Sequence, residues 1–152
     1  MDYGPQHIFM ASGAAGALAH AYRAVTQPGD EILTFAPYFP EYNPYVNLTG
    51  AVLKVVPADT GTFQINFGAF EEMLNEKVTA VLINSPNNPS GVVYSEETIE
   101  RLAGILREKE EEYGHSVFII SDEPYREIAF TGVKVPYVSR YYTNTISCYS
   151  FS

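Results

Sequence analysis

The sequence has 152 residues, of which 46% are hydrophobic, a proportion typical of a globular domain and too high for a disordered chain. Nine basic residues against 18 acidic ones give a formal charge of -9, which argues against a nucleic acid or an anionic membrane as partner. The opening MDYGPQHIFM has no signal-peptide pattern, and no apolar run approaches the roughly 20 residues of a membrane helix. The single cysteine, Cys148, is expected to be a buried structural thiol. We therefore expect a cytoplasmic protein.

The first predicted element is a helix that follows the small residues Ser12 and Gly13. Apolar side chains recur there at helical spacing and trace one face. They are Ala14, Ala17, Leu18, Ala21 and Val25. The turn sequence Pro28-Gly29-Asp30 ends this helix.

Short apolar runs rich in β-branched residues then alternate with helical patterns. The predicted strands are EILTF (31–35), AVLKVV (51–56), TAVLIN (79–84), SVFIIS (116–121) and TISCYS (145–150). The last three alternate little, which is typical of strands covered on both faces in a parallel sheet. Helices are predicted over 67–74 and from a cap at Ser95 to Gly114.

This alternation predicts an α/β fold with a mostly parallel sheet and helices on both faces, in three layers. The unit begins close to its first helix and ends on a strand. We therefore expect it to be an incomplete part of a larger domain.

Ligands of such sheets bind beyond the carboxyl ends of the strands, so the segments found there are the candidate sites. HIFMASGAAGAL (7–18) leads an apolar run into a helix N-terminus, where small residues let backbone N–H groups approach a phosphate. A tight strand-to-helix connection explains this segment equally well. It is neither the dinucleotide glycine pattern nor a nucleotide-triphosphate loop.

Two further segments follow predicted strands. NSPNNPSG (84–91) is an irregular loop whose asparagines could hold a phenolic oxygen, although turn chemistry alone would explain it. In ISDEPYREI (120–128), Asp122 ends an apolar strand, where a carboxylate is costly unless it caps a turn or meets a cationic partner. Tyr125 could project into the same space.

Aromatic residues gather in APYFPEYNPY (36–45), after the strand predicted at 31–35. For Tyr42 and Tyr45 we expect packing in the core or against another subunit. Phe39 is the better candidate for a ring that stacks on a flat ligand.

Taken in order, SGAAGAL, APYFPEY, SPNNPSG and SDEPY resemble the fold type I pyridoxal 5'-phosphate (PLP) enzymes, specifically the aspartate-aminotransferase-like group of class I/II. The resemblance covers nearly the whole chain. It implies that residues 1–152 are the central part of a PLP-binding large domain, with the small domain and the rest of the large domain absent from this chain. It also implies a homodimer that transfers an amino group between an amino acid, aspartate by default, and a 2-oxo acid by Schiff-base chemistry.

The resemblance assigns cofactor-binding roles to several residues. Gly13, Ala14 and Ala15 correspond to the backbone cradle for the cofactor phosphate, and Ser150 corresponds to a phosphate-binding serine. Phe39 corresponds to the residue stacked on the pyridine ring. No metal site is expected.

The same resemblance places three polar residues around the ring. Asn88 and Tyr125 correspond to the pair that binds the phenolic oxygen, and Asn88 also to a ligand of the substrate carboxylate. Asp122 corresponds to the partner of the pyridine nitrogen, so Asp122 and Tyr125 are the expected catalytic residues.

The family's Schiff-base lysine would come directly after Ser152. We expect that the sequence is interrupted there because this lysine carries covalent cofactor; truncation is the alternative. The arginines that bind the phosphate and the substrate carboxylate would also lie further on.

Two other functions compete with transamination. A carbon–sulfur β-lyase of the same fold is one, but those relatives typically have histidine at the position of Tyr125. A sensing domain of a transcription regulator is the other, and it would need a DNA-binding domain of which this sequence shows no sign.

Overall fold

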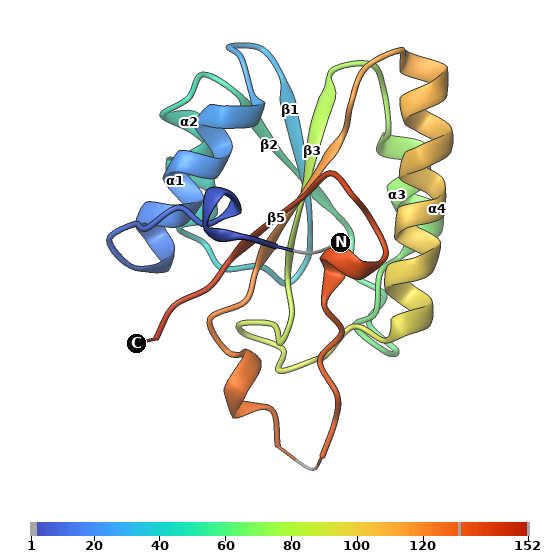
Figure 1. The fold of residues 1–152 in the computed structure, drawn as a ribbon. Helices are drawn as coiled ribbons and strands as arrows, with labels where there is room; N and C mark the ends of the chain where they lie inside the picture. Colours follow the sequence, from blue (N-terminus) through green and yellow to red (C-terminus); the bar gives the residue numbers. More distant parts are fainter. Residues whose placement is uncertain (1–2, 131, 152) are drawn as a thin grey trace.

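A computed structural model describes residues 3–130 and 132–151 and places a five-stranded sheet at the centre of the molecule (Figure 1). The strands are β1 (Glu31–Phe35), β2 (Val52–Val56), β3 (Val78–Asn84), β4 (Phe118–Asp122) and β5 (Thr145–Cys148). They are ordered β2-β1-β3-β4-β5, and each neighbouring pair is parallel. The predicted parallel α/β architecture is confirmed.

Helices cover both faces of this sheet, which confirms the three layers (Figure 1). On one face lie α1 (Gly13–Val25) and α2 (Tyr42–Asn47), and on the other α3 (Phe67–Met73) and α4 (Glu96–Tyr113). Short 3-10 helices occur at η1 (Pro5–His7), η2 (Arg126–Ile128) and η3 (Val138–Arg140).

Each helical layer seals its own apolar core against the sheet. The core under α3 and α4 is centred on Leu33, Phe70, Val81, Leu102 and Ile119. The core under α1 and α2 contains Tyr22, Ile32, Tyr42, Leu82 and Ile120. Alternate residues of each strand contribute their side chains to the two cores, because successive side chains of a strand point to opposite faces.

The ends of α4 are determined by residues expected from the sequence. The Ser95 hydroxyl accepts a hydrogen bond from the Thr98 amide at 3.1 Å, so it caps the first turn. Gly114 closes the helix at a φ of 72°, a left-handed conformation that favours glycine.

Two details differ from the sequence-based prediction. The last strand ends at Cys148 instead of Ser150, and Cys148 is its one buried residue. Thr145 and Ile146 are only partly buried and Ser147 is exposed, so the prediction of burial on both faces was wrong for this strand, which lies at the edge of the described sheet. Helix α2 was not predicted, because aromatic residues and Pro44 conceal its short helical pattern.

The strand order places a topological switch point between β1 and β3, where neighbouring connections leave the sheet in opposite directions. The connection that leaves β1 leads to β2 on one side, and the connection that leaves β3 leads to β4 on the other, so the two connections run in opposite directions. Open α/β sheets bind ligands at such a point, beyond the carboxyl ends of the strands.

Within the part of the chain that the structure describes, no helix combines the length and apolar character needed to cross a membrane.

Candidate active site

Asp122 is the last residue of β4, and its side chain is only 5% exposed. Its Oδ2 accepts a hydrogen bond of 2.5 Å from the hydroxyl of Tyr42 in α2. Its Oδ1 is buried and has no hydrogen-bond partner among the described residues. A buried acceptor without a partner is costly, so this atom marks a place prepared for a donor.

The electrostatic setting of Asp122 follows from its burial. Loss of solvent raises the pKa of its carboxyl from 3.8 to about 6, the hydrogen bond from Tyr42 opposes this rise, and the neighbouring Glu123 adds to it. The pKa of Tyr42 is raised in turn by its own burial and by the Asp122 charge. Tyr42 therefore stays protonated and acts as a donor.

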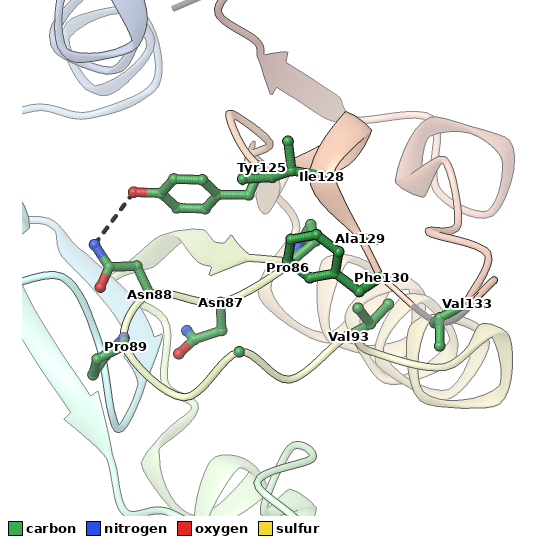
Figure 2. Close-up of a pocket in the computed structure, with 11 residues that line it drawn as sticks. Pro86, Asn87, Asn88, Pro89, Val93, Tyr125, Ile128, Ala129, Phe130 and Val133 are labelled. Atoms are coloured by element: carbon green, nitrogen blue, oxygen red, sulfur yellow. Dashed lines mark hydrogen bonds between the residues drawn. The ribbon is translucent and has the colours of Figure 1, made fainter.

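Asn88 and Tyr125, the two residues that the resemblance assigns to the phenolic oxygen, contact each other. The Asn88 amide Nδ2 donates to the Tyr125 hydroxyl at 3.3 Å (Figure 2). Asn88 lies in the loop after β3, and Tyr125 lies three residues beyond Asp122. The two side chains present an amide and a phenol to one space.

Asn84, a residue that the sequence analysis did not single out, holds these two segments together. It is the last residue of β3 and is buried. Its Oδ1 accepts from the Asn88 amide N–H at 2.7 Å, and its Nδ2 donates to the Asp122 carbonyl at 2.9 Å. An asparagine at the end of an apolar strand was the available signal, since a buried amide must find partners.

The aromatic segment after β1 closes another side of the site. Phe39 is partly buried and meets the Tyr42 ring edge to face, with centroids 5.6 Å apart. Tyr42 is buried in the core, as expected from the sequence, but its contact with Asp122 was missed. Tyr45 is partly buried and bonds to Glu41 at 2.6 Å.

The phosphate-binding candidates lie at the N-terminus of α1 and after β5. Gly13 begins α1 at a φ of 70°, and the Ser12 side chain does not cap the helix, so the first amides of Gly13, Ala14 and Ala15 have no side-chain cap. A short connection joins the end of α1 to the start of β1, which places the helix N-terminus at the edge of the sheet where the strands end. Ser150 is partly buried two residues after β5.

The structure thus brings four of the candidates into one linked group: Phe39, Asn88, Asp122 and Tyr125, connected through Tyr42 and Asn84. No hydrogen bond among the described residues ties Gly13–Ala15 to that group. Ser152 lies outside the described residues, so the interruption expected there stays a prediction.

A cavity of about 660 Å³ opens beside the Asn88–Tyr125 pair (Figure 2). Ile128, Phe130 and Val133 form its apolar side. No charged side chain belongs to the described part of its wall. A carboxylate held in this cavity would therefore need a cation from elsewhere.

A buried ion pair lies directly after the carboxyl end of β4. Glu123 and Arg126 approach to 2.7 Å, with side chains 4% and 8% exposed. Glu123 also accepts from the Ser121 hydroxyl at 2.8 Å, and Arg126 donates to the Val135 and Pro136 carbonyls. Because both charges are paired and hydrogen-bonded, this network fixes the backbone that carries Asp122 and Tyr125.

Comparison with known families and structures agrees with this geometry. The family model described as "Aminotransferase class I and II" matches residues 1–152. The chain is 37% identical over 131 residues to an aspartate aminotransferase of Thermotoga maritima, covering 86% of this chain and 33% of that protein. It is 33% identical over 123 residues to a probable N-acetyl-LL-diaminopimelate aminotransferase of Bacillus subtilis, covering 81% of this chain and 30% of that protein.

Solved structures give the same result. An aminotransferase from Eubacterium rectale superposes with a TM-score of 0.98 at 53% identity, covering 100% of this chain and 38% of that one. The Thermotoga maritima aspartate aminotransferase superposes with a TM-score of 0.85 at 33% identity, covering 96% and 38%. The chain therefore spans about a third of the length of the relatives that it matches.

Proposed function

Because this chain belongs to the class I and II aminotransferase family, we propose that it is part of a PLP-dependent enzyme that transfers an amino group between an amino acid and a 2-oxo acid. Residues 1–152 would form part of the PLP-binding large domain. The observation that carries this proposal is the buried Oδ1 of Asp122, which has no hydrogen-bond partner among the described residues.

The residues of the site fit PLP group by group. A protonated pyridine nitrogen is the donor that Asp122 Oδ1 lacks. The Asn88 amide and the Tyr125 hydroxyl suit the phenolic oxygen, and Phe39 suits the flat ring. The helix N-terminus at Gly13–Ala15, together with Ser150, suits the phosphate.

PLP, when bound, supplies an aldehyde that condenses with an amino group and a ring that draws electrons from the substrate α-carbon. Asp122 would keep the proton on the ring nitrogen, because an ionised carboxylate in a buried site favours a cationic partner. Tyr125 and Asn88 would hold the phenolic oxygen and orient the reactive carbon. Asn88 would also help to bind the substrate carboxylate.

The amino donor is the least constrained part of the proposal. An aspartate-like donor is the default, and two curated relatives are named for aspartate and for N-acetyl-LL-diaminopimelate. The described wall of the cavity beside Asn88 contains no charged side chain. A second carboxylate of the donor would therefore be recognised by a cation outside this described wall.

We also propose that the enzyme is a cytoplasmic homodimer. Large apolar side chains that are exposed in this chain, including Phe9, Met10 and Phe130, would be covered by the rest of the polypeptide and by a partner subunit. Light scattering after size exclusion of the full-length protein would measure the mass directly.

A panel of amino donors and 2-oxo acids, tested with PLP-loaded full-length protein, addresses the proposed activity. We expect an absorbance change on adding a donor alone and formation of a new amino acid when a 2-oxo acid follows. Release of pyruvate and ammonia from cystathionine without any such product would support a carbon–sulfur β-lyase instead. No PLP absorbance and no response to any donor would contradict both reactions.

A further inference from the structure

We propose that Tyr42 is a positioning residue that holds Asp122 by one carboxylate oxygen and so reserves the other oxygen for the pyridine nitrogen of PLP. The inference rests on the proposed function, because it concerns how the chain's own residues receive that cofactor. It adds a role for Tyr42, for which sequence analysis predicted packing alone.

The geometry around Tyr42 fixes its hydroxyl in space. Tyr42 is 1% exposed, and its ring contacts two other aromatic rings. Tyr38 stacks on it at 6.5 Å with an interplanar angle of 20°, and Phe39 meets it at 5.6 Å and 79°. A tyrosine has few rotatable bonds, so a ring packed in this way delivers its O–H to one point.

The carboxylate of Asp122 needs such an anchor because its terminal torsion is broad and nearly two-fold. One short hydrogen bond to Oδ2 removes that freedom and determines which oxygen stays unpaired. The other groups that face this carboxylate come from two elements and from the residue that follows β4. They are Tyr22 of α1, Cys148 of β5 and the adjacent Glu123.

None of these other groups substitutes for Tyr42. The Tyr22 hydroxyl is buried without any hydrogen-bond partner among the described residues. The pKa of the Cys148 thiol is raised to about 12 by burial and by the two carboxylates, so it adds no positive charge. Glu123 disfavours a second negative charge beside it. The hydrogen bond from Tyr42 is thus the interaction that keeps Asp122 ionised against its burial.

Two conservative substitutions test the proposal in the full-length apo protein. Tyr42→Phe removes the hydroxyl that bonds to Asp122, and Tyr22→Phe removes a buried hydroxyl of the same core that does not. Two quantities are measured: the dissociation constant for PLP, by absorbance titration, and the pKa of the Asp122 carboxyl, by NMR with isotope-labelled aspartate. Asp122→Asn assigns the carboxyl signal.

We expect Tyr42→Phe to weaken PLP binding by about tenfold or more and to raise the carboxyl pKa by about one unit, since a hydrogen bond to a charged group is lost. Tyr22→Phe should change neither quantity measurably. Equal behaviour of the two variants would overturn the proposal. If wild-type protein bound no PLP, the proposed function would fail, while the apo carboxyl pKa would still test the role of Tyr42.

A second substitution at position 42 keeps the proposal testable if Tyr42→Phe does not fold. Fluorotyrosine at position 42 keeps the ring and the hydroxyl but makes the O–H a stronger donor. The carboxyl pKa should then fall instead of rise. A rise, or no change, would contradict the proposed role.

Discussion

The hydroxyl of Tyr42 donates a hydrogen bond of 2.5 Å to Oδ2 of Asp122, a residue 80 positions away in the sequence. This contact joins the short helix after β1 to the carboxyl end of β4. Asp122 is only 5% exposed, and its Oδ1 has no hydrogen-bond partner among the described residues. The candidate site is therefore partly assembled by the packing of its core, before any ligand is considered.

Replacing Asp122 with Asn should stabilise the apo protein above about pH 6. The folded-state pKa of this carboxyl is raised from 3.8 to about 6, so the folded state binds more protons than the unfolded state between these values. Stability contributed at this position therefore falls as pH rises through that window. Asp122→Asn should raise the free energy of unfolding at neutral pH by up to about 3 kcal/mol, and by little near pH 4.

Denaturant unfolding of wild type and Asp122→Asn across this pH range measures the difference. Asp59→Asn is the matched control, because hydrogen bonds from Thr62 and Gly61 lower the pKa of that exposed carboxyl. Its effect should be small and of opposite sign: a slight destabilisation at neutral pH that disappears as the pH falls through the lowered pKa of Asp59. A difference for Asp122→Asn that does not change with pH would contradict the account.

Replacing Asn84 with Ala should remove the hydrogen bonds that connect the loop after β3 to the end of β4 and should lower the free energy of unfolding. The change leaves the Asn88 amide N–H and the Asp122 carbonyl without their side-chain partner, at a cost of about 1–3 kcal/mol. Asn47→Ala, which removes an exposed 3.4 Å contact with Asn43, should stay within about 0.5 kcal/mol. Similar losses for both variants would show that Asn84 has no special linking role.

Replacing Arg126 with Met should destabilise the protein by about 3–5 kcal/mol, because Glu123 would stay buried without its partner. Arg101→Met removes an exposed pair with Glu71 at 3.5 Å and should cost no more than about 1 kcal/mol. Denaturant unfolding of the two variants gives the comparison. Equal costs would mean that the buried pair does not hold the β4 end in place.

Replacing Phe39 with Leu should weaken PLP binding by about twofold to tenfold, the loss expected for one aromatic ring contact. Phe39→Trp should retain the affinity. Phe63→Leu, at an exposed ring that does not belong to the linked group around Asp122, serves as the control. An absorbance titration with PLP decides the point, and an unchanged affinity for Phe39→Leu would exclude a stacking role.

Much of the fold could be predicted from the sequence because its elements obey local rules. Apolar runs such as 79–84 and the cap at Ser95 indicate their structures over a few residues. The end of β5 could not be predicted in this way, since the residue types at 145–150 do not reveal where the backbone pairing with β4 stops. Helix α2 was hidden by aromatic residues that serve the core.

The candidate site was predictable where a residue's type shows its chemistry. Asp122 at the end of an apolar strand and Asn88 in a proline-rich loop could be singled out for that reason. Tyr42 and Asn84 could not be assigned their contacts, because a buried tyrosine or asparagine can bond to any element that the fold brings near. Only the three-dimensional arrangement shows that both meet Asp122.

The central claim is that Asp122 receives a protonated pyridine nitrogen at its unpaired oxygen. NMR of PLP labelled at that nitrogen, bound to the full-length protein, tests this most directly. The account predicts a nitrogen that stays protonated from neutral to mildly alkaline pH in wild type and loses its proton in Asp122→Asn. An unprotonated nitrogen in wild type at neutral pH, or equal protonation in the two proteins, would contradict it.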